Sequence, residues 1–168
     1  MPNLETITEI ASNASWDVVL LLGFVIAGFF YGLWSGRARL IAVLFSLYVS
    51  KLLFENFRFI DLLTQGREAL EIFLIRIAVF GVAVIVLAFL FARILPAPKS
   101  FVRERWWQIF LLSFLEIGLF ISIAFQLLPN DTLFTFSPLV NYLFASPDAF
   151  FWWLFLPLPA LFFTIQRQ

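Results

Sequence analysis

Residues 72–95 read IFLIRIAVFGVAVIVLAFLFARIL, a stretch that is apolar almost throughout. Its charged residues are Arg76, near the beginning, and Arg93, near the end. An α-helix needs about 20 apolar residues to cross a hydrocarbon core about 30 Å thick, with a working range of roughly 17–25. Pro96 and Pro98 follow directly and end the helix, because a residue before proline avoids the α region. The stretch therefore predicts a transmembrane helix.

Four further apolar stretches flank this one: Val18–Trp34, Leu40–Phe54, Ile109–Leu128 and Phe150–Ile165. The first and third of the four reach spanning length, whereas Leu40–Phe54 and Phe150–Ile165 are marginal. We expect an all-α, polytopic membrane protein, built as a bundle of four to five transmembrane helices. A short acidic N-terminal segment, residues 1–16, precedes a single transmembrane helical domain, residues 17–168.

The composition points to the same class of protein. The chain is 62% hydrophobic and 13% charged, whereas soluble domains are near half apolar and a quarter charged. A net charge of +0 argues against nucleic acid as a partner, because nucleic-acid binding needs a basic surface. The chain has no Cys and no His, which removes thiol chemistry and the commonest metal ligand. We expect no enzyme activity, no catalytic residue, no cofactor and no metal site.

The distribution of Lys and Arg predicts the orientation in the membrane, since these residues favour the cytoplasmic side. Arg37 and Arg39 follow the first apolar stretch, and residues 93–105, after the third, carry four cations. Residues 129–148, after the fourth, carry none. The pattern predicts an outside N-terminus and a cytoplasmic C-terminus. Tryptophans near the ends of the stretches, with Trp152–Trp153 at the outer start of the last, favour the same orientation.

The first apolar stretch contains three glycines spaced by four residues, Gly28, Gly32 and Gly36. Residues at this spacing lie on one face of an α-helix. In lipid, small residues promote helix association because they let two backbones approach closely. The face is therefore a packing surface, either for a second copy of the chain or, as we favour, for the second or third helix of the same chain.

Arg37 and Arg39 lie in the very short turn that follows these glycines. They could bind anionic lipid head groups, each worth about 1 kcal/mol near such a surface. The simpler interpretation is that they only set the topology.

Glu116 lies near the middle of the fourth apolar stretch. A charged residue at the centre of a span costs roughly 2.5–3.5 kcal/mol on insertion scales, and such residues are functional candidates by default. Glu116 could carry protons, bind a cation or pair with Arg76, the other ionisable residue well inside a span. The structural alternative is a protonated carboxyl that forms a local hydrogen bond, for instance with Ser113.

The outer segment and the last stretch contain prolines with positional meaning. Ser137-Pro138 is typical of a helix start and predicts a short amphipathic helix on the outer side. Pro157 and Pro159 lie inside the last stretch, where proline is tolerated if neighbours satisfy the freed carbonyls. Phe150–Ile165 is then either a full crossing or a re-entrant hairpin.

Asp17 at the start of the first helix, the three glycines, the basic turn Gly36–Arg39 and the segment Ser137-Pro138-Leu139 follow one another in this chain. Over about residues 15–145 the chain thereby resembles the CvpA (colicin V production protein) family of bacterial inner-membrane proteins. Phe150–Ile165 extends beyond the four-helix core of that family. The resemblance implies an inner-membrane location and a role in toxin production or export, or in envelope homeostasis.

Two functions are compatible with these features. The first is a membrane protein that works through helix–helix contacts, with membrane lipids around it and either a second copy or another membrane protein as partner. The alternative is a small transporter or channel subunit that uses Glu116.

Overall fold

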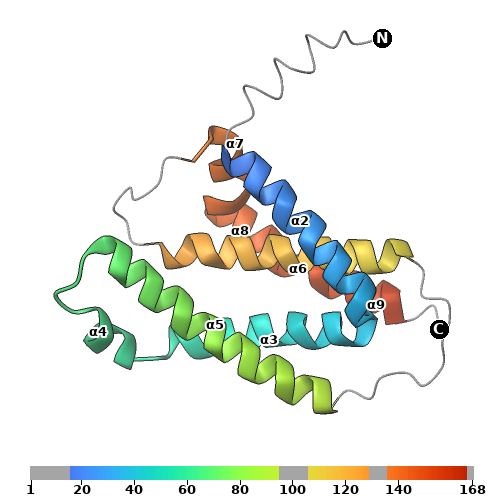
Figure 1. The fold of residues 1–168 in the computed structure, drawn as a ribbon, viewed down its shortest axis with the longest axis horizontal. Coiled ribbons are helices and arrows are strands. Elements are labelled where there is room, and N and C mark those ends of the chain that lie inside the picture. Colours follow the sequence, from blue (N-terminus) through green and yellow to red (C-terminus); the bar gives the residue numbers. More distant parts are fainter. Residues whose placement is uncertain (1–15, 95–105, 129–135, 166–168) are drawn as a thin grey trace, which may run out of the picture.

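The computed structural model describes residues 16–94, 106–128 and 136–165 (Figure 1). The acidic segment up to residue 15, the basic loop 95–105 and Arg167 lie outside the described residues. All regular elements in the described ranges are helical: α2 (Trp16–Ser35), α3 (Arg37–Glu55), α4 (Phe59–Thr64), α5 (Ala69–Ile94), α6 (Trp106–Leu127), α7 (Pro138–Val140), the π-helical turn η1 (Asn141–Ala145), α8 (Pro147–Phe155) and α9 (Pro157–Ile165).

Three of the described helices are long and apolar enough to cross a bilayer, namely α2 from Val18 to Ser35, α5 and α6. They correspond to the three stretches that the sequence places at full spanning length. α3 has 19 residues, but charged residues near both of its ends shorten its apolar part. The described chain is thus an all-helical assembly with three candidate spans, as expected of a membrane protein.

The helices alternate in direction along the chain (Figure 1). α2 and α5 run one way, and α3 and α6 run the other way. The α2–α3 junction, the end of α5 and the start of α6 therefore lie at one end of the bundle, here named the junction end. The end of α3, α4, the start of α5 and the end of α6 lie at the opposite end, here named the α4 end (Figure 1).

α6 is the central helix of the bundle. It packs against α2, α3, α5, α8, α9 and η1. Its Leu112, Leu119 and Ile123 are almost fully buried in one core with Leu40 and Leu44 of α3. Half of the residues in the spanning part of α6 are buried, whereas only 6% of the residues in the spanning parts of α2 and α5 are buried. α2 and α5 thus present most of their apolar surface outward, which is stable only where lipid or another helix covers it.

α3 packs most extensively against α5, and small residues explain how it can approach a neighbour closely. Ala42, Ser46 and Ser50 of α3 are fully buried and, at a spacing of four, share one face. The Ser46 hydroxyl donates to Val43 O at 2.6 Å, within its own helix. Small side chains of this kind permit the close backbone contact that holds helices together in lipid.

The last apolar stretch forms two helices rather than one. α8 ends at Phe155 and α9 begins at Pro157, with Leu156 between them. Pro157 and Pro159 lack the N–H groups that would bond the carbonyls of Trp153 and Phe155. Phe150–Ile165, for which the sequence leaves a full crossing and a re-entrant hairpin open, is therefore two helices with a break at Leu156, because the prolines interrupt the hydrogen-bond ladder in its middle.

The short helix predicted at Ser137-Pro138 is confirmed. α7 begins at Pro138, and the Ser137 side chain accepts a hydrogen bond from Val140 N. A second serine–proline pair, Ser146-Pro147, starts α8 in the same way, with Ser146 Oγ accepting from Ala149 N at 3.2 Å. In both cases the serine satisfies an N–H group that the helix start leaves free.

Candidate functional site

The glycine face of α2 packs within the chain, but against α6. A Cβ at Gly28 would overlap the Ile117 side chain. One at Gly32 would overlap Ser113 Oγ and lie 2.9 Å from Ile109 Cγ2. The expectation that the second or third helix is the main partner is wrong, because the fourth apolar stretch occupies this face. Leu40 of α3 also reaches Gly32.

Gly36 has a different role from the other two glycines. It lies outside α2 and links it directly to α3, with φ 77° and ψ 163°, a conformation that is essentially restricted to glycine. Its N–H donates to Gly32 O at 2.9 Å, and its carbonyl accepts from Leu40 N at 3.3 Å. Gly36 thus completes the end of one helix and the start of the next, so it is not part of the packing face.

Arg37 and Arg39 lie in the first turn of α3 at the junction end, with Arg37 half-buried and Arg39 exposed. The turn that the sequence suggests over residues 35–39 is reduced to Gly36 alone, because α3 begins at Arg37. Trp34 next to this turn is 91% exposed, and Trp106 at the start of α6 is also exposed. Cations and indole rings therefore gather at the junction end, as they do at membrane interfaces.

Glu116 lies at the middle of α6, about 15 Å from each helix end at 1.5 Å per residue. Its Oε2 is buried and has no hydrogen-bond partner among the described residues, and the same holds for Ser113 Oγ. The predicted hydrogen bond between these two side chains is absent. Glu116 is spaced by three and four residues from Leu112, Leu119 and Phe120, so it shares their face of the helix. The carboxyl therefore adjoins an apolar core.

Arg76 does not pair with Glu116. Its Nη1 donates to Leu127 O at the end of α6, at 3.5 Å. Cations are favourable at this position, since the last carbonyls of a helix carry partial negative charge. Arg76 also lines a polar cavity of about 390 Å³ at the α4 end, here named the α4-end cavity. The charged residues that line this cavity are Lys51, Glu55, Arg58, Asp61 and Arg76.

A second packing site on α6 was not found by sequence reasoning. The Trp153 ring lies over Gly118, where any Cβ would overlap it, and it stacks on Phe144 with ring centroids 5.3 Å apart. Ser122 Oγ donates to Phe144 O at 3.1 Å, and Trp153 Nε1 donates to Leu143 O at 2.8 Å. Trp153 is thus a packing residue near the middle of α6, which corrects its expected place at the outer interface. Gly118 was the available signal.

Tyr48 links α3 to the break between α8 and α9. Its hydroxyl donates to Leu154 O at 2.6 Å. Leu154 lies between Trp153 and Phe155, the residues whose carbonyls lose their helical donors to the prolines. The Leu154 carbonyl is not one of those two, because its helical donor would be the N–H of Leu158, so Tyr48 holds the segment at the break without replacing a donor that proline removes.

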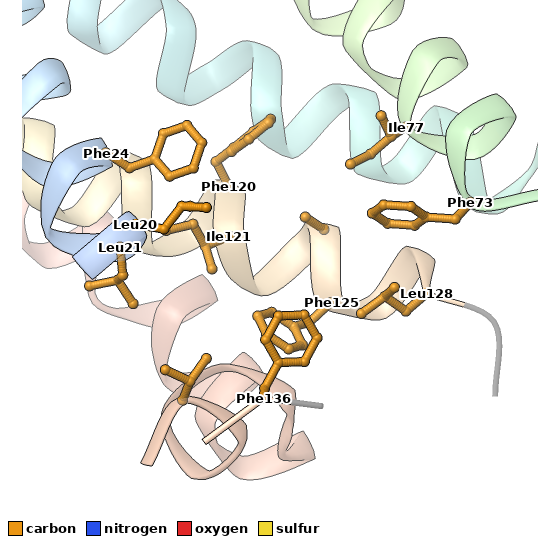
Figure 2. A pocket seen from close by; sticks show the side chains of 12 residues that line it. Leu20, Leu21, Phe24, Phe73, Ile77, Phe120, Ile121, Phe125, Leu128 and Phe136 are labelled. Carbon is orange, nitrogen blue, oxygen red and sulfur yellow. The ribbon is translucent and has the colours of Figure 1, made fainter. Parts of the chain in front are cut away.

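An apolar groove of about 360 Å³ lies between the three candidate spans (Figure 2). Leu20 and Phe24 of α2 form one wall, Phe73 and Ile77 of α5 form the other, and Phe120 of α6 lies between them (Figure 2). Almost all of its lining surface is apolar. The groove and the α4-end cavity share one segment of α5. Arg76 lines the cavity, and it lies in the sequence between Phe73 and Ile77, which line the groove.

Within the described ranges, no group of three or more His, Cys, Asp or Glu side chains could hold a metal ion. The described sites therefore comprise an unpartnered central carboxyl, a polar cavity rich in cations and an apolar groove. No known protein family, no curated protein and no solved structure matches this chain.

Proposed function

We propose that the chain is a non-enzymatic, multi-pass protein of the bacterial inner membrane that supports toxin export or envelope homeostasis, as the resemblance to the CvpA family implies. It crosses the membrane four to five times, with its N-terminus outside and its C-terminus in the cytoplasm. It works through helix–helix contacts with a second copy or with another membrane protein. The alternating helix directions support an arrangement in which successive spans are joined at opposite membrane faces.

The observation that carries this proposal is the free apolar face of α5. Over its 26 residues, Phe80 alone among the described side chains of this helix is buried. Val82, Ile85, Phe89 and Ile94 are all more than half exposed. α2 also presents an exposed apolar face, but another of its faces is occupied by α6 at Gly28 and Gly32. The outward face of α5 is therefore the surface on which we expect a partner helix to pack.

Crosslinking in native membranes tests this proposal, and the absence of cysteine from the sequence gives a clean background. Ile85→Cys and Phe89→Cys place thiols one turn apart on the outward face of α5. Leu22→Cys on α2, which is also exposed, is the matched control. We expect a bifunctional maleimide to join the α5 variants to a partner that mass spectrometry identifies. Equal, sparse crosslinking at all three positions would mean that lipid alone covers α5 and would contradict the proposal.

A second candidate function, a small transporter or channel subunit, is favoured by one specific observation. Glu116 Oε2 is buried at the centre of a candidate span without a hydrogen-bond partner among the described residues. Unpaired ionisable groups at this depth commonly mark proton or cation pathways. A carboxyl that serves only the fold would be expected to have a partner, since an unmet buried acceptor costs about 1–3 kcal/mol.

Reconstituted vesicles separate this candidate from the first. Under the transport hypothesis, Glu116→Gln abolishes a proton- or cation-dependent flux while the protein still folds. Glu55→Gln, which removes an exposed carboxylate at the α4 end, is the control and leaves the flux unchanged. An unaltered flux in Glu116→Gln would remove the argument for transport.

A further inference from the structure

The α4-end cavity brings together cations from three separate parts of the fold. Lys51 comes from the last turn but one of α3, Arg58 from the turn before α4, and Arg76 from α5. Glu55 and Asp61 are the acidic residues of the lining, and Asn56 and Gln126 are polar and neutral. The convergence of Lys51, Arg58 and Arg76 does not follow from their positions in the sequence.

The described ion pairs leave two of these cations without a carboxylate. Lys51 Nζ pairs with Glu55 Oε1 at 3.2 Å, and it also lies 5.4 Å from the centre of the Phe150 ring. Neither Arg58 nor Arg76 has a carboxylate within 4.0 Å in the described part of the chain. The Asn56 side chain already has a hydrogen-bond partner, because its Nδ2 donates to Leu52 O at 2.9 Å. Two guanidinium groups and one carboxylate, Asp61, therefore remain, and the excess charge is positive.

Guanidinium groups favour one class of anion. The planar fork of arginine donates two parallel N–H bonds, which match the oxygens of a phosphate group. One N–H group of Arg76 donates to Leu127 O, and the other N–H groups of its guanidinium remain as donors. The cavity lies where α3 ends and α5 begins, so its depth is that of the head-group layer rather than the hydrocarbon core if these helices cross the bilayer.

We propose that the α4-end cavity binds the phosphate group of an anionic phospholipid, with Arg58 and Arg76 as its donors. The proposal rests on the membrane location proposed above. Basic pockets between membrane helices bind anionic lipid head groups on the cytoplasmic side of membranes, and the pairing of guanidinium with phosphate is the same at the outer face, where the proposed orientation places this end. A lipid also explains why the apolar groove lies alongside, since Phe73 and Ile77 flank Arg76 in α5 and line that groove (Figure 2). Free inorganic phosphate would use the cavity but not the groove.

Lipid titration of the purified full-length protein, followed by native mass spectrometry, tests the site. Phosphatidylglycerol is titrated against phosphatidylcholine for the wild-type protein, Arg58→Gln, Arg58→Lys and Arg67→Gln. Arg67 is the matched control, because it is exposed at the same end, pairs with Glu71 and does not line the cavity. We expect a preference for phosphatidylglycerol that falls about tenfold or more in Arg58→Gln, since the variant loses charge-assisted hydrogen bonds to the phosphate. Arg58→Lys keeps the charge but loses the fork, so its affinity is intermediate.

Each outcome decides the proposal. A preference that survives Arg58→Gln, or falls equally in Arg67→Gln, overturns it, because general surface charge would then explain the binding. If inorganic phosphate binds with the same affinity as the lipid and displaces it, the ligand is free phosphate and the lipid assignment is overturned. Because Arg58 is exposed, we expect its variants to fold, and carbonate extraction is the check that they remain in the membrane. This result is independent of the crosslinking at α5.

Discussion

Gly32 and Gly23 belong to the same helix but have opposite surroundings. A Cβ at Gly32 would meet Ser113, Ile109 and Leu40, whereas one at Gly23 would have nothing within 4 Å. The spacing of glycines along α2 therefore matters less than the face on which each lies. Gly32 lets α2 approach the central helix, and Gly23 lies on the outward side.

Gly32→Leu should separate α2 from α6. Because the new side chain overlaps three neighbours, the free energy of unfolding should fall by about 1–3 kcal/mol, the usual cost of overpacking. Unfolding in detergent, followed by circular dichroism, measures the change. Gly23→Leu is the control and should leave the stability unchanged or raise it slightly, because leucine favours helices more than glycine does. Equal losses in the two variants would contradict the assigned packing face.

Two buried serines of α6 should respond in opposite directions to the same substitution. Ser122 Oγ donates to Phe144 O, so Ser122→Ala should lower the free energy of unfolding by about 0.5–1.5 kcal/mol. Ser113 Oγ has no hydrogen-bond partner among the described residues, so Ser113→Ala should raise it by about 1 kcal/mol. Each variant is the control for the other in the same unfolding assay. A loss in Ser113→Ala would show that its hydroxyl has a partner in the membrane.

At the scale of elements, the break between α8 and α9 depends on a residue far away in the sequence. Tyr48→Phe removes the hydroxyl that donates to Leu154 O, so hydrogen exchange around residues 153–158 should accelerate. A net loss of about 0.5–1.5 kcal/mol is expected for one hydrogen bond, which corresponds to exchange that is about 2- to 12-fold faster. Tyr31→Phe on the exposed side of α2 is the control and should not alter exchange in this segment. Unchanged protection in Tyr48→Phe would mean that packing alone holds the break.

The sequence predicts the helices better than their pairing. Hydropathy and length identify α2, α5 and α6 because both depend on local composition. The cap at Ser137 is equally local, since it involves residues three apart. The contact of Gly32 with α6, by contrast, joins residues separated by about half of the chain, and small residues indicate a contact without identifying the partner. For the same reason Tyr48 carries no recognisable signal, and Trp153, which packs on Gly118, suggests an interfacial position instead.

The candidate sites show the same difference between local features, which the sequence reveals, and long-range contacts, which it does not. Glu116 is identified from sequence because a carboxyl within an apolar stretch is conspicuous there. The α4-end cavity is not, because Lys51, Arg58 and Arg76 appear along the chain as separate interfacial charges. Only the folding of α3 beside α5 brings them together.

At the scale of the whole molecule, the junction end and the α4 end should lie on opposite sides of the membrane. Single cysteines at Trp34 and Gln65, which lie at these two ends, test this in intact cells with a membrane-impermeant maleimide. The predicted orientation requires Gln65→Cys to react at once and Trp34→Cys to react only after the cells are permeabilised. The reverse pattern would invert the topology, and reaction of both in intact cells would contradict the crossing of α3.

The link at Gly36 has a consequence for how the protein enters the bilayer. With one residue between α2 and α3, no polar loop separates them, and the backbone of Gly36 bonds one group at the end of α2 and one at the start of α3. The insertion machinery would therefore receive two directly linked helices, and the two segments would partition into lipid together. The marginal apolar length of α3 matters less under this coupling, because the more hydrophobic α2 contributes the free energy of transfer for both.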